Sequence, residues 1–408
     1  MNMFELIATC PEETKDVLIK ELEILGVKKI TPKYKAVFFE VSEPLFYQVH
    51  LKLRTASRLL RIVKNVPAAS KEMLYDQSRR IHWPEFFSSD VSFVVEGVVA
   101  DRGTDGMKSN DVSKKVKEGI YKAFERENRA LPRIDLKDPQ VVVVAFLQGG
   151  SCVISLETSG KSMHKRGYRL DGHPAPLKET LAASILLMAG YDGSECLWDP
   201  MCGSGTIAIE GAMIALQKAS QIHRKKGDFG FEWLLGFNRA LWREIQDEAR
   251  EERKETLIAP IVASDINPTY VELARKNALR ARVEKYMHFD VRSFLVITRA
   301  EVEDVMNRSK TAAANTSGGF KGILIANLPY GERLNKNKEQ ELKDLYREVG
   351  NTLKRSFFGW RAALLISEDA PYKFIGLRPE KKISLLNGSI RVKLLLFSLY
   401  EGSKKGSS

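Results

Sequence analysis

Cysteine and histidine are scarce in this chain. The four cysteines, Cys10, Cys152, Cys196 and Cys202, are scattered without a CxxC pair, and the six histidines show no metal-ligand spacing. These patterns support neither a disulfide framework nor a zinc site. We therefore expect no bound metal.

Long hydrophobic runs are also absent. No stretch approaches the roughly 18 uninterrupted apolar residues of a membrane span. The N-terminus, MNMFELIATCPEE, lacks a basic region and meets acidic residues at once, unlike a secretory signal. With 44% apolar and 28% charged residues, the 408-residue chain has an ordinary globular composition, which favours a cytoplasmic protein of two or three domains.

Acidic residues are in the minority, and the net charge is +12. Residues 351–408 alone carry eleven Lys and Arg against four Asp and Glu. Such a surplus favours a polyanionic partner, because each phosphate contact releases counterions. It equally fits a surplus that serves only solubility, so charge by itself leaves both interpretations open.

The front half alternates short strands and helices in an α+β order. FELIAT, a helix with Leu18, Leu22 and Leu25 on one face, and AVFFEV (36–41) indicate a βαβ-type unit. The segment LRTASRLLRIV predicts a basic helix or turn with Arg54, Arg58 and Arg61 on one face. A strand over 91–99, a helix over 111–127 and a hairpin of VVVVAF with CVISLE complete this half.

A polar, Gly/Pro-rich segment, 161–177, predicts a linker, and the pattern changes after it. Strands CLWD, IVASD, GILIAN and AALLIS alternate with helices, which is typical of a doubly wound parallel sheet. KKISLL and RVKLLLFSL predict a closing antiparallel hairpin. Residues 305–320 are expected to form a mobile loop, and 401–408 a flexible tail.

The segment LWDPMCGSGTIAIEGAMIA (197–215) predicts a strand, a glycine loop and a helix. Gly203 and Gly205 let the backbone approach a ligand closely, and the helix N-terminus attracts an anionic group. The carboxyl edge of a strand is where doubly wound folds bind nucleotides. A plain tight turn is the alternative, since the GxGxxG spacing and the P-loop lysine are missing.

Two more strand ends carry polar groups. In VASDINP (262–268), Asp265 is a candidate for ribose hydroxyls, although Asp265 or Asn267 could instead cap the helix after Pro268. In ILIANLPYGERL (323–334), Asn327 offers an acceptor oxygen and Tyr330 a ring for stacking, on a backbone fixed by Pro329. The alternative is an ordinary strand-to-loop turn.

Together these motifs resemble those of bacterial RNA guanine methyltransferases that carry an N-terminal THUMP domain. DPMCGSGT (199–206) is similar to the family's DPxCGSGT cofactor loop, and NLPYGERL (327–334) to its NPPYGERL catalytic motif. HKRGYR, APLKETLAASIL, FGFEWLLGFNRALWREI and LLNGSIRVKL extend the match. LRTASRLL, LYDQSRRIHW and VSKKVKEGIYKAF resemble THUMP segments and their ferredoxin-like leader, so the resemblance covers nearly the whole chain.

The resemblance implies an α/β fold with four parts. These are a ferredoxin-like domain (1–60), a THUMP RNA-binding domain (61–160), the linker, and a Rossmann-like class I methyltransferase domain (178–400) with a C-terminal antiparallel hairpin. It also implies S-adenosyl-L-methionine as cofactor. The cofactor-binding residues would be Thr180, Asp199, Pro200, Cys202, Gly203, Ser204, Gly205, Thr206, Asp265, Asn267 and Asn327, with Asp290 or Ser293 near the adenine.

The catalytic residues implied are Asn327, Leu328, Pro329 and Tyr330, with Leu328 standing where the family usually has proline. If Asn327 Oδ1 and the Leu328 carbonyl accept both N–H groups of an exocyclic amine, its lone pair is oriented for methyl transfer. Tyr330 would stack on a flipped-out base. The implied substrate is the guanine 2-amino group of structured RNA, either 23S ribosomal RNA or tRNA.

Lys165, Arg166, Tyr168, Arg169 and Arg333 are candidates for RNA contacts, against the alternative of a solvated basic linker. Two other functions stay open at this point. A DNA adenine methyltransferase would share the cofactor loop, although such enzymes usually have Asp at the position of Asn327. A non-catalytic RNA-binding assembly factor would have lost some of the motif residues that are intact here.

Overall fold

The computed structural model describes residues 3–100, 106–170, 177–308, 321–329 and 338–400, and it divides into two compact units. The first unit contains Met1–Met163 and Arg224–Asp247, and the second contains His164–His223 and Glu248–Ser408. The segment Arg224–Asp247 lies inside the range 178–400 expected for the methyltransferase domain. In the structure it packs with the first unit.

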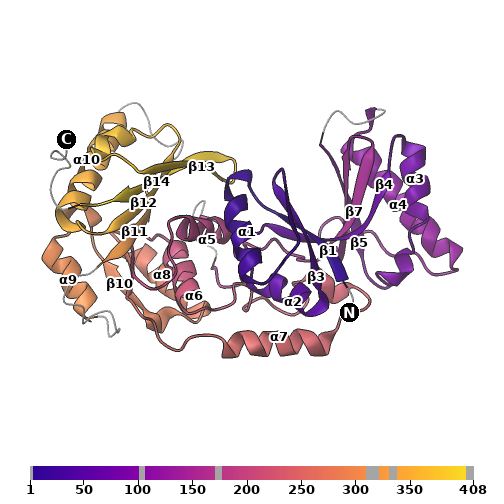
Figure 1. Cartoon of the computed structure of the whole chain (residues 1–408), viewed down its shortest axis with the longest axis horizontal. Helices are drawn as coiled ribbons and strands as arrows, with labels where there is room; N and C mark the ends of the chain where they lie inside the picture. The colour runs from indigo at the N-terminus through magenta and orange to yellow at the C-terminus, as the bar shows by residue number, and fades with distance from the viewer. Residues whose placement is uncertain (1–2, 101–105, 171–176, 309–320, 330–337, 401–408) are drawn as a thin grey trace. The chain divides into compact units, whose positions relative to one another are not determined.

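The first unit is built on one seven-stranded sheet with the order β2-β3-β1-β4-β7-β6-β5 (Figure 1). Its strands are β1 (Met3–Thr9), β2 (Ile30–Lys33), β3 (Ala36–Ser42), β4 (Arg58–Pro67), β5 (Phe93–Val99), β6 (Val141–Gln148) and β7 (Ser151–Glu157). Its helices are α1 (Lys15–Ile24), α2 (Glu43–Lys52), α3 (Lys71–Arg79) and α4 (Ser109–Arg126). Strand β4 runs through the expected boundary at residue 60, so the ferredoxin-like and THUMP regions share a sheet.

Two local predictions for this unit are wrong. The first strand, helix and strand do not form a parallel βαβ unit, because β2 intervenes and β1 pairs with β3 antiparallel. The segment LRTASRLLRIV is neither helix nor turn after Arg58, since Arg58 and Arg61 lie on β4. Leu59 and Leu60 are both buried, and a strand covered on both faces loses the alternating pattern that identifies strands.

The second unit contains the predicted doubly wound sheet, with the order β10-β9-β8-β11-β12-β14-β13. Its strands are β8 (Cys196–Asp199), β9 (Ile261–Asp265), β10 (Met287–Val291), β11 (Gly322–Asn327), β12 (Arg361–Ser367), β13 (Lys381–Asn387) and β14 (Ile390–Ser398). The first five are parallel, and β13 and β14 form the predicted antiparallel hairpin. The helices are α5 (Glu179–Met188), α6 (Thr206–Ala215), α8 (Pro268–Arg280), α9 (Arg299–Arg308) and α10 (Lys338–Ser356), while α7 (Arg239–Glu251) crosses the division between units.

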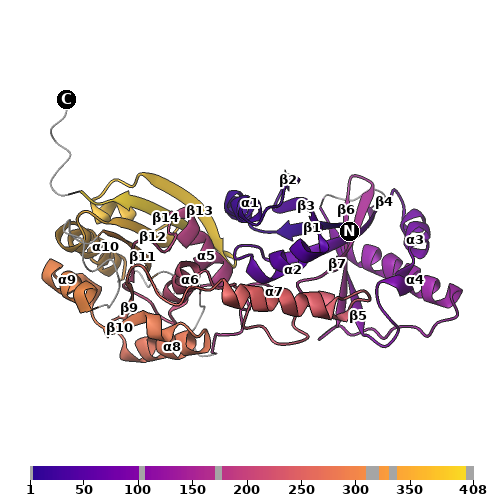
Figure 2. The ribbon, with the colours of Figure 1, turned by 60° about the horizontal axis from the view of Figure 1, so that its bottom comes forward.

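Helices cover both faces of this sheet (Figure 2). Successive residues of a strand point to opposite faces, so Leu197 packs with α5, α6 and α8, whereas Trp198 packs with α9 and α10. The burial is continuous: every residue of β8 and of β9 is buried. This explains why these strands are apolar throughout rather than alternating.

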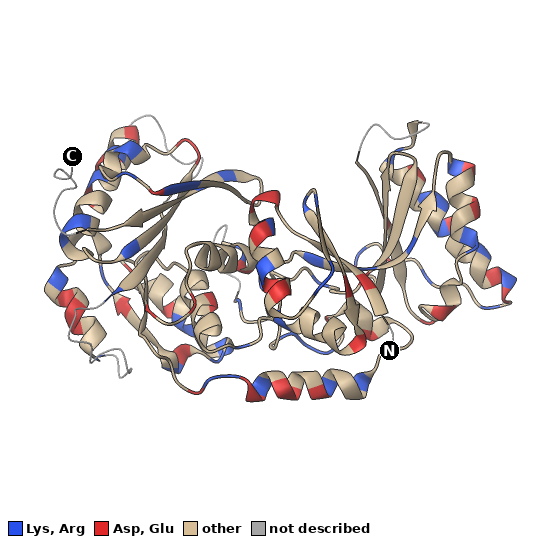
Figure 3. Ribbon diagram, viewed as in Figure 1, with Lys and Arg blue, Asp and Glu red and all other residues tan. Residues whose placement is uncertain are grey.

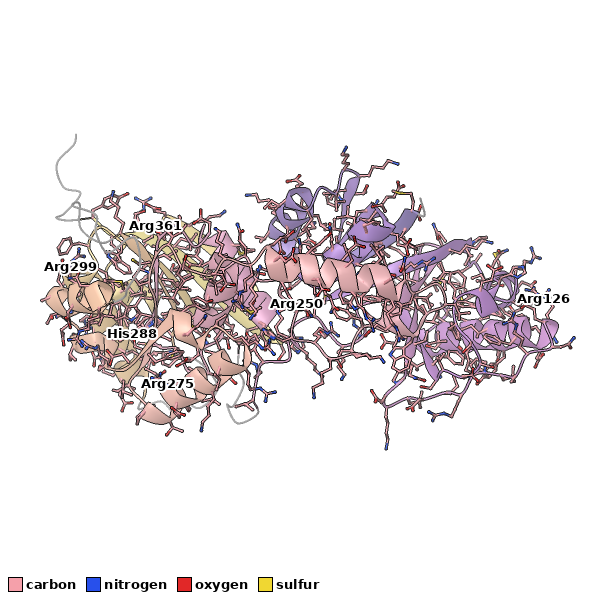
Figure 4. All side chains as sticks on the ribbon, turned by 90° about the horizontal axis from the view of Figure 1, so that it is seen from below. Arg126, Arg250, Arg275, His288, Arg299 and Arg361 are labelled. Carbon is pink, nitrogen blue, oxygen red and sulfur yellow. The ribbon has the colours of Figure 1, made fainter. Side chains whose placement is uncertain are left out.

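The strand order reverses at β8, which lies between β9 and β11. Because β8, β9, β10 and β11 are parallel, their carboxyl ends Asp199, Asp265, Val291 and Asn327 lie on one edge of the sheet. Ligands of doubly wound folds bind at such a reversal. At the opposite edge Arg361, labelled in Figure 4, donates to the Ala189 carbonyl and the Glu195 carboxylate.

The loop expected at 305–320 is partly helical, because α9 continues to Arg308. Residues 309–320 and the tail 401–408 lie outside the described residues, as do 171–176 of the expected linker. Within the described ranges, no helix combines the length and apolar character needed to cross a membrane.

Candidate active site

The glycine loop between β8 and α6 makes a tight turn at two left-handed positions. Gly203 has φ of 50° and Gly205, which precedes the first residue of α6, has φ of 81°. A Cβ on Gly205 would lie 2.8 Å from the Ala274 Cβ of α8. The loop therefore needs glycine at Gly205 both for its backbone conformation and for its approach to α8.

Asp199 ends β8 as a buried acid whose Oδ1 has no hydrogen-bond partner among the described residues. Burial raises the pKa of Asp199 well above its usual range, and the charge of Asp265 adds to this, while the amides of Met201 and Ala208 oppose it. An unsatisfied buried carboxylate oxygen is costly. Its position beside the glycine loop suits a ligand that brings a positive charge or an N–H donor.

Asp265, at the end of β9, holds the glycine loop against its own strand. Its Oδ2 accepts a hydrogen bond from the Gly203 amide at 3.0 Å, and its Oδ1 accepts one from the Asn267 amide at 2.9 Å. The helix cap is Asn267, whose Oδ1 accepts from the Thr269 amide at 2.9 Å. The cap and the candidate ribose ligand are thus separate residues.

Asn327 ends β11, and its buried Oδ1 has no hydrogen-bond partner within the described part of the chain. The next residue, Leu328, is buried, and its amide donates to the Leu365 carbonyl of β12 at 3.0 Å. This bond, which proline could not make, fixes the backbone just beyond Asn327. Pro329 is exposed, and Tyr330 and Arg333 lie outside the described residues.

The end of β10 does not decide between the two candidates for adenine contact. Asp290 Oδ2 accepts from Arg292 Nε at 2.7 Å, and the Arg292 amide donates to the Asp265 carbonyl at 2.9 Å. Ser293 precedes a short 3-10 helix, Phe294–Val296. Both stay predictions.

Arg169 ties the glycine loop to the start of α5. Its guanidinium donates to Ser204 Oγ at 3.2 Å, to Thr206 Oγ1 at 3.0 Å and to the Glu179 carboxylate at 2.8 Å. Thr180 follows Glu179 in the first turn of α5 and is buried. Arg169, predicted for RNA, is thus engaged within the loop that sequence reasoning assigned to the cofactor.

The other predicted loop residues are buried around the same turn. Pro200 is buried, and the Cys202 amide donates to the Ser264 carbonyl of β9 at 3.0 Å. Burial raises the pKa of the Cys202 thiol well above its usual range, with Asp199 and Asp265 adding to it. Cys202 is therefore a packing residue of the turn in its neutral form.

The structure removes Arg166 and Tyr168 from the predicted RNA contacts, because both are buried at 1% exposure. Arg166 Nε lies 3.5 Å from Glu210 Oε1, and the Tyr168 hydroxyl donates to the same oxygen at 3.0 Å. The overlooked signal is Glu210, an acid in the otherwise apolar helix TIAIEGAMIA, since a buried acid needs a partner. Lys165 is exposed and stays a candidate.

Sequence reasoning also missed Asn277, a buried residue of α8. Its Nδ2 donates to the Ser204 carbonyl at 2.9 Å, and its Oδ1 accepts from the Leu170 amide at 2.8 Å. A polar residue beside Ala274 and Ala278 on the buried face of a helix was the available signal. Among the described residues, no group of three or more His, Cys, Asp or Glu is arranged to hold a metal ion.

Comparison with family models divides the chain into three matched regions. Residues 166–395 match the RMKL-like methyltransferase domain, residues 68–157 the THUMP domain, and residues 5–60 the RlmL ferredoxin-like domain. The ribosomal RNA large subunit methyltransferase K/L of Shewanella frigidimarina is 31% identical over 409 residues, covering 99% of this chain and 54% of that protein. The chain thus spans about half the length of the curated relatives it matches.

Solved structures also match over nearly the whole chain, among them the following two. SMU.472 complexed with SAH has a TM-score of 0.81 at 26% identity, over 99% of this chain and 100% of that one. A predicted N6-adenine-specific DNA methylase from Listeria monocytogenes has a TM-score of 0.83 at 25% identity, over 98% and 97%. These neighbours and the sheet order confirm the Rossmann-like methyltransferase fold, and the match over residues 166–395 shows that the chain belongs to the family of RMKL-like methyltransferase domains.

Proposed function

We propose that this protein is an S-adenosyl-L-methionine-dependent methyltransferase that modifies the exocyclic 2-amino group of a guanine in structured RNA, with 23S ribosomal RNA as the substrate. The observation that carries the proposal is Asn327 Oδ1. It is a buried acceptor without a partner among the described residues, at the sheet edge where the glycine loop also lies.

The residues at the carboxyl edge of the sheet fit the chemical groups of the proposed cofactor. S-adenosyl-L-methionine, when bound, supplies an electrophilic methyl group on a sulfonium. Asp199 Oδ1 is buried beside the loop without a partner among the described residues, which suits the cofactor's ammonium group. Asp265 ends the neighbouring strand, where doubly wound folds bind a ribose. The solved complex of SMU.472 with SAH, the demethylated cofactor, adds support from a related chain.

In the proposed mechanism the protein orients the target amine and does not abstract a proton from it. The lone pair of an exocyclic amine is delocalised into the base, so the amine is a poor nucleophile. Asn327 Oδ1 and the Leu328 carbonyl would each accept one N–H group and turn the lone pair out of the ring plane. An amide cannot act as a base, so the proton leaves to water after methyl transfer.

Two features hold these acceptors in place. The Leu328 amide is bonded to β12, and Asn327 follows five buried residues of β11. A preorganised dipole of this kind costs no reorganisation when charge develops. Tyr330 as the stacking ring, and Lys165 and Arg333 as RNA contacts, belong to the proposal.

RNA as the substrate class is supported by the THUMP match and by the name of the Shewanella relative. The Listeria neighbour's name favours a second candidate, methylation of adenine in DNA. Asn327 argues for the RNA proposal, because DNA adenine methyltransferases usually have Asp there. A tRNA substrate and a non-catalytic assembly role are the remaining alternatives.

The test is methylation by the purified chain, with isotope-labelled cofactor, of large-subunit ribosomal RNA, tRNA and duplex DNA in parallel. We expect N2-methylguanosine in ribosomal RNA. Asn327→Ala should lower kcat by about 100-fold or more. Asn351→Ala, the same change at an exposed residue of α10, should leave kcat unchanged.

Each other outcome supports a different function. Labelled adenine in duplex DNA would favour the second candidate, and labelled tRNA alone would change the substrate. Absence of cofactor binding by calorimetry, or full activity of Asn327→Ala, would contradict the proposed mechanism.

A further inference from the structure

The segment Arg224–Asp247 interrupts the methyltransferase sequence but is an integral part of the first unit. The Phe231 ring packs edge-on against Phe46, Tyr47 and His50, with centroids 5.7, 5.3 and 5.0 Å away. The Asn238 amide donates to the Tyr47 hydroxyl at 2.9 Å. A Cβ on Gly230 would lie 2.1 Å from the Glu157 carbonyl of β7, so the segment is packed closely against the sheet.

The outer surface of this segment forms a hollow of about 250 Å³ lined by ten of its residues. Lys225, Lys226, Arg239 and Arg243 line it and are exposed. None of these four forms an ion pair with any residue in the described ranges. Like charges gathered in this way repel one another and favour the binding of an anion.

The rest of the hollow does not neutralise these cations. Its fifth basic residue, Arg224, stacks over the Phe229 ring at 4.3 Å and donates to the carbonyls of Ser159, Lys161 and Asp228. Its one acid, Glu232, accepts from the Gly227 and Phe229 amides. One acid against five basic residues leaves the hollow positively charged, and the aromatic residues Phe229, Phe237 and Trp242 also line it.

Helix α7 contributes one wall of the hollow. Arg239, Arg243 and Gln246 recur at i, i+4 and i+7 and line the hollow, while Trp242 and Ile245 are buried. Asp247 lies one turn after Arg243, and Figure 3 shows both signs along the helix. Arg239 and Arg243 are the residues of α7 that add positive charge to the hollow.

We propose that this hollow is a docking site for backbone phosphates of the substrate RNA. The proposal rests on the proposed function for the identity of the polyanion. Lysine and arginine heads contact phosphate oxygens without reading base edges, so the site contributes affinity and positioning rather than sequence choice. A segment of the methyltransferase sequence thereby becomes part of the RNA-binding unit.

The test uses the full chain and fluorescence anisotropy with a transcript of large-subunit ribosomal RNA across a salt series. Lys225→Gln/Lys226→Gln and Arg239→Gln/Arg243→Gln should each weaken RNA binding by about tenfold at 0.1 M salt. Each should reduce the slope of log K against log salt by about 2, because each phosphate contact contributes about 0.9. Cofactor affinity and kcat at saturating RNA should not change.

Lys20→Gln/Lys28→Gln is the matched control, because it removes the same charge from exposed lysines of the same unit. It should leave the salt slope within about 0.5 of wild type. An equal loss in the control would show that net charge alone matters and would overturn the proposal. Thermal unfolding of every variant separates loss of binding from loss of folding.

The outcomes also separate this proposal from the proposed function. If the chain methylates RNA and both hollow variants bind RNA as tightly as wild type, the docking site is overturned and the proposed function stands. If the hollow variants lose RNA binding but the chain methylates no RNA, the docking site stands and the proposed function is overturned. Competition by polyglutamate as strong as by RNA would make the hollow a general anion site and contradict the RNA assignment.

Discussion

Arg166 and Glu210 form an ion pair in which both side chains are completely buried, with Arg166 Nε 3.5 Å from Glu210 Oε1. The Tyr168 hydroxyl donates to the same carboxylate oxygen. The segment HKRGYR therefore holds the chain that enters the methyltransferase unit against α6. Arg166 and Tyr168 therefore serve packing, although they are residue types that RNA-binding segments use.

Removing one partner of this pair should be costly. Arg166→Met leaves Glu210 buried without its cation, so the free energy of unfolding should fall by about 3–5 kcal/mol in urea titration. The RNA affinity of the folded fraction should not change. Arg166→Met/Glu210→Leu is the control and should recover most of the loss. A variant with wild-type stability and weak RNA binding would restore Arg166 as an RNA contact.

The glycine loop offers a matched pair of substitutions. Gly205 and Gly359 both have φ of +81°, but a Cβ on Gly205 would lie 2.8 Å from Ala274 Cβ, whereas one on Gly359 would meet nothing within 4 Å. Both alanine variants should lose about 1 kcal/mol of stability from the backbone conformation. Only Gly205→Ala should also weaken cofactor binding in calorimetry, by about tenfold or more. Equal cofactor affinity in the two variants would disprove the requirement for close approach to α8.

Asp199 should couple cofactor binding to proton release. Burial raises the pKa of its carboxyl group well above the usual range before the ligand binds. An ammonium group placed beside it favours the charged form and lowers that pKa again. We therefore expect up to one proton to be released per cofactor bound near pH 7, measured as a dependence of the binding enthalpy on buffer ionisation. Asp199→Asn should bind more weakly and release none; equal release from this variant would exclude Asp199 as the source.

Glu157 should make the stability of the first unit depend on pH. Burial raises its pKa to about 7 from 4.5, against the opposing effects of Ser159 and Arg58. Because the folded-state pKa is raised, its contribution is fully present below about pH 4.5 and is lost as the pH rises through about 7. Wild type should therefore lose on the order of 3 kcal/mol relative to Glu157→Gln between pH 4 and pH 8.

The control for this pH series is Gln148→Ala, which removes an exposed side chain without a titratable group from β6 of the same sheet. Its difference from wild type should stay nearly constant over the range. Chemical unfolding of the three proteins at each pH measures both differences. A constant difference for Glu157→Gln as well would contradict a raised pKa at Glu157.

Local sequence pattern predicted the strand ends of the second unit that form the candidate site. The strands CLWD, IVASD and GILIAN have the predicted bounds, because each is a short apolar run that stops at a polar residue with a helix or loop signal after it. Parallel strands bring such ends to one edge whatever their separation in sequence. The amino-acid sequence alone was therefore sufficient to place Asp199, Asp265 and Asn327 together.

The roles of the basic segments were decided only by tertiary packing. Whether Arg166 and Tyr168 face solvent depends on Glu210, more than forty residues further along the chain. The position of Arg224–Asp247 depends on aromatic contacts with α2. Arg58 and Arg61 have a helical spacing yet lie on strand β4, where Leu59 and Leu60 between them are both buried. Local periodicity does not show which distant residue a charged side chain will contact. The sequence therefore determined where the ligand-binding strand ends come together. Long-range packing decided which cationic side chains remain available to bind a ligand.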